Sequence, residues 1–167
     1  MEHNIGEDIR LVPIDLGYTK AIFDGFDEDV IQFLPLDGVS GKIEDTKTFI
    51  THAMNQMKLG DDLVWVILYK DGFAGCCGIH NIVSKNPHFG LWIKTEAQGK
   101  GIGKKVVHHL LQWGITNLDV EYIKYPVDRR NAKSISLIKE LDLEQADRYE
   151  MGNLKKLDVL EYRLYKK

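Results

Sequence analysis

The order of apolar and polar residues divides the chain into short strands and amphipathic helices. A strand alternates its side chains with a period of two, and a helix repeats an apolar face about every 3.6 residues. On these criteria the first sixty residues predict a strand within 8–16, a helix over 18–32, a loop over 34–41 and a helix over 42–59. The nearly continuous apolar run at 63–69 predicts a strand covered on both faces. The turn signal in Lys-Asp-Gly then favours an antiparallel return over 73–81, and a third strand follows over 88–93.

The remaining part of the chain predicts alternating helices and strands. An apolar stripe over 102–118 indicates a helix of about four turns, and the pattern over 120–127 indicates the next strand. A strand–helix–strand passage of this length implies a right-handed crossover between parallel strands. Asn131 is placed to cap a helix that runs to Leu141, and strands over 143–150 and 157–165 follow. The predicted fold class is α/β, an α+β arrangement with one mixed sheet, in the order β-α-α-β-β-β-α-β-α-β-β and as a single domain over residues 1–167.

Composition and charge narrow the class of protein. Hydrophobic residues make up 44% and charged residues 28%, as in soluble globular proteins. The formal net charge of −3 argues against duplex nucleic acid as the main partner, because that normally needs a basic face. No apolar run approaches the roughly 20 residues that cross a bilayer, and the first residues lack the pattern of a signal peptide. We therefore expect a cytoplasmic protein with no nucleic-acid or membrane partner.

The segment over 95–107 places glycines and lysines where a helix is predicted to begin. Glycine is the poorest helix former after proline, and lysine near a helix start faces the positive end of the helix dipole. One interpretation is a flexible loop before a helix. The other is a phosphate site, because successive glycines turn backbone N–H groups toward one point and the helix start and lysines add positive charge. The residues concerned are Gly99, Lys100, Gly101, Gly103, Lys104 and Lys105.

The sequence Gln98-Gly99-Lys100-Gly101-Ile102-Gly103 fits the Q/R-x-x-G-x-G/A motif and resembles the GNAT superfamily of acetyl-CoA-dependent N-acetyltransferases. In that superfamily the motif binds the coenzyme A pyrophosphate at the start of a central helix. The segment HFGLWI at 88–93 resembles the E-I-G-Y-W-I strand of the branch with ribosomal-protein-alanine and spermidine acetyltransferases. Residues 129–144 resemble the N-x-x-S…E-K-L-G-F-x-x-E segment of the same branch. The resemblance covers about residues 8–165 and implies the GNAT fold.

The resemblance also implies which residues bind the acetyl donor, acetyl-CoA, and no metal is implied. Backbone groups of the strand that ends at Ile93 would pair with the pantetheine arm, and an N–H near Ile93 would face the thioester oxygen. Asn131 would hydrogen-bond the coenzyme arm, with a plain helix cap as the alternative. The coenzyme-binding residues so implied are Leu91, Trp92, Ile93, Gln98, Gly99, Lys100, Gly101, Ile102, Gly103, Lys104 and Asn131.

Two residues are candidates for catalysis. Ser134 falls where the branch often has a serine near the sulfur, so it would protonate or hydrogen-bond the leaving thiolate; an ordinary polar residue in the first helical turn is the alternative. His88 stands where the branch often has a glutamate base, and imidazole can accept a proton from an ammonium group. A surface histidine is the alternative there, and His80 is a second candidate base. A tyrosine acid that many members carry on the helix of Ser134 is replaced here by Ile138.

The sequence indicates the acetyl donor more clearly than the amine that accepts the acetyl group. The two early helices usually form the acceptor side of the fold, and their carboxylates, with Asp24 and Glu28 as the candidates, would suit a cationic amine. A solvated helix face is the alternative for these residues. The expected function is direct acetyl transfer to a primary amine of a protein N-terminus, a polyamine or another small molecule. The alternative is a coenzyme-A-binding domain with little catalysis that acts as a sensor or interaction partner. A homodimer is compatible with the sequence in either case.

Overall fold

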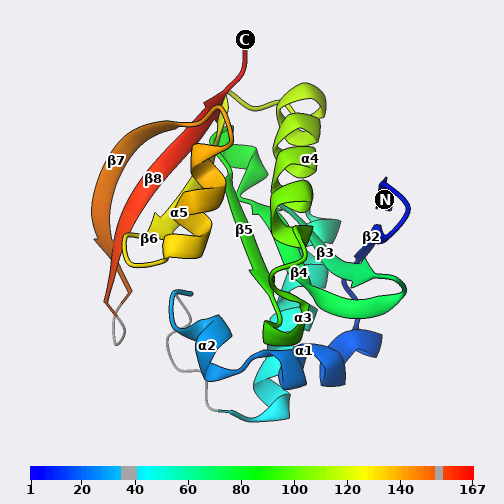
Figure 1. Ribbon diagram of the computed structural model, residues 1–167. Coiled ribbons are helices and arrows are strands. Elements are labelled where there is room, and N and C mark those ends of the chain that lie inside the picture. The colour runs from blue at the N-terminus through cyan, green and yellow to red at the C-terminus, as the bar shows by residue number, and fades with distance from the viewer. Residues whose placement is uncertain (35–40, 153–155) are drawn as a thin grey trace.

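The computed structural model describes residues 1–34, 41–152 and 156–167, and its strands form one mixed sheet (Figure 1). The strand order across this sheet is β1-β2-β3-β4-β5-β6-β8-β7. Neighbours are antiparallel except β5 and β6, which are parallel, as the crossover through the central helix predicts. The strands are β1 (His3–Ile5), β2 (Ile9–Pro13), β3 (Asp62–Tyr69), β4 (Gly72–His80), β5 (His88–Ile93), β6 (Tyr122–Asp128), β7 (Glu144–Met151) and β8 (Leu157–Tyr165).

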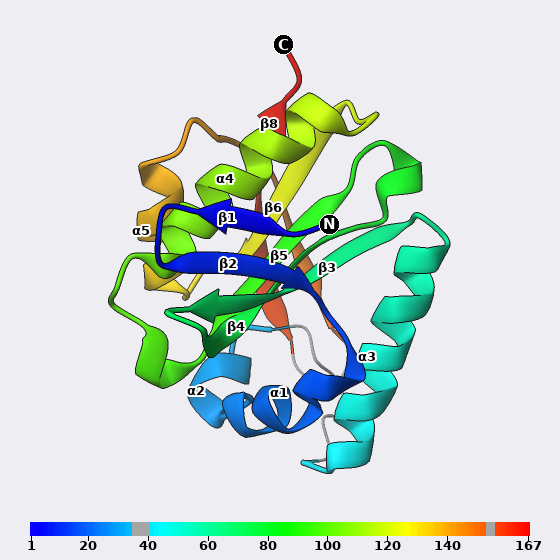
Figure 2. The ribbon, with the colours of Figure 1, turned by 90° about the vertical axis from the view of Figure 1, so that its right-hand side faces the viewer.

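Helices cover both faces of the sheet. The α-helices are α1 (Thr19–Gly25), α2 (Glu28–Ile31), α3 (Ile43–Lys58), α4 (Ile102–Asn117) and α5 (Ala132–Lys139), and 3₁₀ turns lie at Leu16–Tyr18, Ile82–Ser84 and Thr95–Ala97. The helix α4 packs on one face and α1 and α3 pack on the other, and Figure 2 shows them on opposite sides of the strands. None of the helices in the described part of the chain is long and apolar enough to span a membrane.

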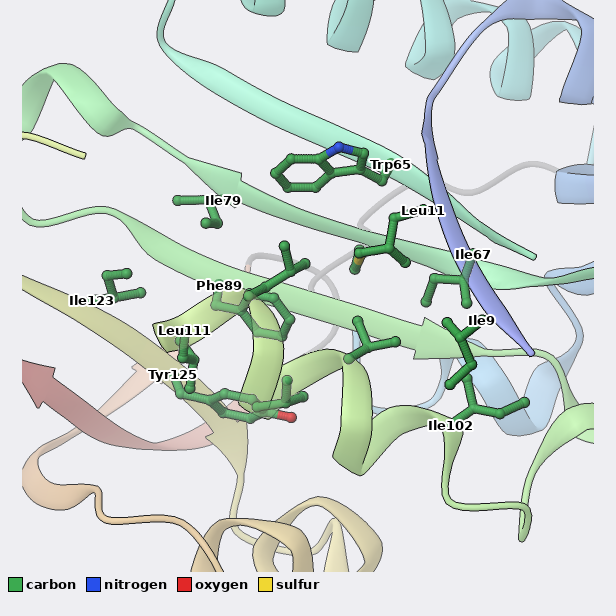
Figure 3. Packing of buried hydrophobic residues seen from close by; sticks show 14 of the residues in the cluster. Ile9, Leu11, Trp65, Ile67, Ile79, Phe89, Ile102, Leu111, Ile123 and Tyr125 are labelled. Atoms are coloured by element: carbon green, nitrogen blue, oxygen red, sulfur yellow. The ribbon is translucent and has the colours of Figure 1, made fainter. Parts of the chain in front are cut away.

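Alternating side chains of β3 belong to two separate cores. Trp65 and Ile67 pack with α4 residues such as Ile102, and Figure 3 shows this cluster around Phe89 and Tyr125. The intervening residues of β3 pack instead with buried residues of α1 and α3. The prediction that this strand is covered on both faces is therefore confirmed.

The mixed α/β class is confirmed, and two details of the predicted order are wrong. The helix predicted over 18–32 is two helices, because the Asp27 carboxylate accepts a hydrogen bond from the Val30 N–H (2.9 Å) and starts α2 anew. The pattern also missed β1, whose three residues are too few to show a period. The predicted loop over 34–41 lies mostly outside the described residues.

The parallel strands β5 and β6 separate soon after they meet. Their ladder holds a single residue pair, His88 with Lys124, supported by the Lys124 N–H donating to the Pro87 carbonyl at 2.8 Å. In Figure 1, α5 lies between β5 and the curved pair β7–β8, on the side of β5 opposite α4. The carboxyl half of β5 thus has β4 on one edge and, among the described strands, no partner on the other.

Candidate functional site

A pocket of about 660 Å³ lies where β5 and β6 separate. We call it the coenzyme pocket. One wall is the loop and first turn of α4, a second is the end of β5, a third is the start of α5, and α2 lies at the rim. Of the residues that the sequence implies for the coenzyme and the thiolate, the pocket wall contains Leu91, Trp92, Ile93, Gln98, Gly99, Gly101, Ile102, Gly103, Lys104, Asn131 and Ser134, but not Lys100.

The first turn of α4 presents backbone N–H groups to this pocket. Gly101 is the N-cap residue and has φ of 76°, and Gly99 has φ of 80°. Such left-handed conformations favour glycine, which has no Cβ to clash with the backbone. A Cβ added at either glycine would meet no atom within 4 Å, so the space beside them is open. The turn is a helix start with unpaired donors and positive partial charge, which suits an anion.

The open edge of β5 forms the second wall. The Lys94 N–H donates to the Ala74 carbonyl of β4 at 2.8 Å, so the backbone groups of Ile93 and Leu91 point to the opposite, open side. The Gln98 amide donates to the Ile93 carbonyl at 2.9 Å and thereby holds the glycine loop against the strand. An extended arm could add to this edge as a strand does.

The start of α5 supplies the polar side chains of the third wall. The Asn131 carboxamide oxygen accepts from the Ser134 N–H at 3.3 Å, so the cap that the sequence predicts is formed. The Asn131 amide nitrogen, which carries two donor hydrogens, is not used by that cap. Capping and ligand binding therefore involve different atoms of one side chain.

A buried tyrosine forms a hydrogen bond with Ser134, and no sequence pattern indicated this contact. Tyr125 lies on β6, is 5% exposed and stacks on Phe89 with ring centroids 5.6 Å apart. Burial raises the pKa of Tyr125 to about 12, and its hydrogen bond with Ser134 opposes that rise. Tyr125 of β6 thus forms a hydrogen bond with Ser134 of α5.

A buried carboxylate fixes the turn between β6 and α5. The Asp128 side chain is fully buried and accepts hydrogen bonds from the Arg130 N–H (2.9 Å), the Arg130 Nε (2.8 Å) and the Asp158 N–H (3.1 Å). The Arg130 guanidinium is the main cause that lowers the pKa of Asp128. This turn sets the position of Asn131.

The cations near the pocket differ from those that the glycine motif suggests. Lys104 forms an ion pair with Glu140 at 2.6 Å, and Lys100 donates to the Glu96 carbonyl at 3.2 Å. Lys133 lies in the pocket wall and donates to the Gln98 side-chain oxygen at 2.8 Å. Arg130 also lies in this wall, so the turn before α5 and the first turn of α5 contribute charge that only the Arg-Arg-Asn-Ala-Lys run at 129–133 could have indicated.

The structure does not bring His88 to the coenzyme pocket. His88 begins β5, and its Cα lies about 16 Å along an extended strand from that of Ile93. It lines a second, smaller pocket together with His80. Of the acceptor candidates, Asp24 pairs with Lys20 at 2.6 Å on the exposed surface and Glu28 is exposed in the first turn of α2. Neither lines the coenzyme pocket.

The remaining reactive groups have structural roles. Cys76 and Cys77 are buried in β4, and burial raises the pKa of both thiols far above the ordinary value. They are poor nucleophiles, since the thiolate is the reactive form.

Among the described residues, no three His, Cys, Asp or Glu side chains gather in an arrangement that could hold a metal ion.

The coenzyme pocket fits a phosphorylated, extended ligand. The open space beside Gly99 and Gly101 leaves the helix start accessible to a phosphate. A Cβ on Gly103 would lie 3.5 Å from Leu91 and 3.8 Å from Leu137, so a side chain there would extend into the pocket between these walls. The donor set of this site is backbone N–H groups, amides and cations, which is the chemistry of pyrophosphate binding.

The acetyltransferase (GNAT) domain model matches residues 8–144. No curated protein has a sequence that matches this chain significantly.

Solved structures share the fold at low sequence identity. The acetyl transferase from Salmonella typhimurium that modifies the N-terminal serine of ribosomal protein L7/L12 is 16% identical, with a TM-score of 0.85 over 99% of both chains. The microcin C7 self-immunity acetyltransferase MccE, in complex with acetyl-CoA and AMP, is 19% identical, with a TM-score of 0.83 over 96% of this chain and 94% of that chain. RimJ of Mycobacterium smegmatis, in complex with a CoA disulfide, is 16% identical, with a TM-score of 0.85 over 94% of this chain and 81% of that chain.

Proposed function

Since the chain belongs to the GNAT acetyltransferase family, we propose that it is an acetyl-CoA-dependent N-acetyltransferase that acetylates a primary amine by direct transfer. The observation that carries the proposal is the coenzyme pocket, which combines a glycine-capped helix start with the open edge of β5. These two features suit the two parts of the donor, its pyrophosphate and its extended arm.

The pyrophosphate would lie at the N-terminus of α4. The N–H groups that follow Gly99 and Gly101 would donate to its oxygens, and Lys133 and Arg130 would add charge from the facing wall. A phosphate there offsets the electrostatic cost of lysines near the positive end of the helix dipole.

The acetyl group would lie beside β5. Backbone groups of Leu91 and Ile93 point to the open edge, so an N–H of this segment would stabilise the negative charge that develops on the thioester oxygen. The amine nitrogen attacks the carbonyl carbon, the carbon–sulfur bond breaks, and coenzyme A leaves as a thiolate. Ser134, which lines the pocket and forms a hydrogen bond with Tyr125, would hydrogen-bond or protonate that sulfur.

Two measurements test the proposal. Calorimetry with acetyl-CoA should give saturable binding, and its absence at millimolar ligand would contradict the proposal. A panel of primary amines, including peptides with free N-termini and polyamines, should then show release of free thiol with at least one amine. Saturable binding without thiol release from any amine would favour the coenzyme-binding domain with little catalysis.

A further inference from the structure

A second pocket of about 400 Å³ lies between α3 and the ends of β3, β4 and β5. Leu91 and Ile93 lie near Gly103 of α4, so the alternate residues of β5, Gly90 and His88, face the α3 side. We call this space the Asp62–His80 pocket. It is lined by Phe49, His52, Ala53, Gln56, Asp61, Asp62, His80, Asn81 and His88.

Two paired glycines let the His80 ring lie along the sheet. Gly78 of β4 is directly opposite Gly90 of β5, so neither strand places a side chain there. A Cβ on Gly78 would lie 2.7 Å from the His80 Nε2, and one on Gly90 would lie 4.0 Å from the same atom. The ring therefore extends over Gly78 toward Gly90, and Gly90 precedes the open edge at Leu91.

The other ring nitrogen of His80 is fixed by a carboxylate. His80 Nδ1 lies 3.0 Å from the Asp62 Oδ2, and the second oxygen of Asp62 accepts from the Asn81 N–H at 3.0 Å. The side chains are 28% and 14% exposed, so water screens the pair only in part. An ionised carboxylate only accepts hydrogen bonds, so the neutral ring carries its proton on Nδ1 and has a lone pair on Nε2.

His80 has a carboxylate partner that fixes its ring. The His88 ring stacks on the His80 ring with centroids 5.1 Å apart, and His88 is exposed at the start of β5. The contact with Asp62 therefore distinguishes His80 as a histidine of this pocket that is held in one orientation. The other charged or titratable groups that line the pocket are Asp61 at the start of β3 and His52 on α3.

We propose that His80 is the general base of the transfer, with Asp62 as its positioning residue, and that the acceptor amine approaches through the Asp62–His80 pocket. This inference rests on the proposed function. His80 Nε2 takes one proton from the substrate ammonium, directly or through one water, and the neutral amine then attacks the thioester. The carbon–sulfur bond breaks, the attacking nitrogen loses its second proton, and the thiolate takes up one proton on the Ser134 side. The products are an amide, coenzyme A and a protonated His80, which then releases its proton to water.

The test compares His80→Gln, Asp62→Asn, His88→Gln and the control His108→Gln, which alters an exposed histidine of α4. His80→Gln should slow transfer about 100-fold at neutral pH and leave the dissociation constant of acetyl-CoA within about twofold. The deficit should shrink at about pH 9.5, because more of the amine is then already neutral. Asp62→Asn should lower kcat about tenfold with little change in KM, and His108→Gln should behave as the wild type.

An outcome in which His80→Gln stays within about threefold of the wild type, or in which His88→Gln alone removes the pH dependence, overturns the inference and leaves the proposed function standing. If acetyl-CoA does not bind at all, both fail together. Nitrogen NMR of the intact chain tests the inference without any amine substrate, because it reports which ring nitrogen of His80 carries the proton. The neutral His80 ring should carry its proton on Nδ1, and a ring protonated on Nε2 would overturn the inference.

Discussion

The coenzyme pocket and the Asp62–His80 pocket lie on either side of β5 and differ in the chemical groups that line them. The first is made largely of backbone, from a strand edge and a helix start that follow each other along the chain. The second is made of side chains from three strands and a helix, brought together by the register of β3, β4 and β5. A site built from contiguous backbone leaves a motif in the sequence, whereas a site built from side chains across a sheet does not.

Substitutions should therefore have different effects in the two pockets. The coenzyme pocket depends on backbone conformation, and substitutions that strain its turns should weaken acetyl-CoA binding. The Asp62–His80 pocket depends on particular functional groups, and changes there should alter the rate and its pH dependence. Three substitutions on the coenzyme side test how far the two pockets are independent.

The largest effect is expected for Asp128→Ala, which removes the carboxylate that fixes the turn before α5. Loss of its hydrogen bonds leaves the Asp158 N–H and Arg130 without their acceptor and should lower the free energy of unfolding by about 3 kcal/mol. Acetyl-CoA binding should weaken, while the His80 tautomer stays unchanged. Urea unfolding and calorimetry check both effects.

The same substitution should show a pH signature. The pKa of Asp128 is lowered in the folded protein from the ordinary 3.8, so its stabilisation is complete above that value and is lost as the pH falls through the lowered pKa. The difference between wild type and variant should therefore shrink as the pH falls below 3.8. Asp147→Ala, which removes an exposed carboxylate that accepts from the adjacent Arg148 N–H, is the control. An equal loss of stability in both variants would contradict this account.

A smaller effect is expected for Gly101→Ala, which is matched by Gly6→Ala. Both glycines have positive φ, 76° and 63°, and neither has an atom within 4 Å of an added Cβ. Each substitution should cost about 1–2 kcal/mol of stability. Gly101→Ala alone should weaken acetyl-CoA binding, by about tenfold, because a Cβ and any relaxation of the turn disturb the N–H groups of α4. Equal affinity of the two variants would show that phosphate does not bind at this turn.

The smallest effect is expected for Lys133→Gln, which removes a cation from the coenzyme pocket. Lys133 is exposed and bonds to the Gln98 side chain, so acetyl-CoA affinity should fall only about threefold, and less at high salt. Lys139→Gln at the last turn of the same helix is the control and should leave the affinity unchanged. A loss that does not depend on salt would indicate a packing role for Lys133. Calorimetry at two ionic strengths separates these results.

The glycine loop, the capped helix at Asn131 and most element boundaries could be predicted because each depends on residues close together in the chain. The strands at 88–93 and 157–165 match the structure at both ends. The split between α1 and α2 could not be read from apolar periodicity, because one capping side chain, Asp27, decides it. Tyr125 was missed for another reason: its partner Ser134 lies on the next element, and nothing in a strand pattern shows where a hydroxyl group points.

The sequence by itself determined the glycine loop of the coenzyme pocket, since a run of six residues from Gln98 to Gly103 carries both the turn geometry and the helix start. Only the tertiary structure brought together the residues of the Asp62–His80 pocket. Asp62 and His80 are 18 residues apart and meet because β3 and β4 pair with Asp62 opposite His80. Their ring and carboxylate have room because Gly78 and Gly90 face each other across the next pair of strands. Strand register, which depends on the packing of the whole sheet, places these groups together.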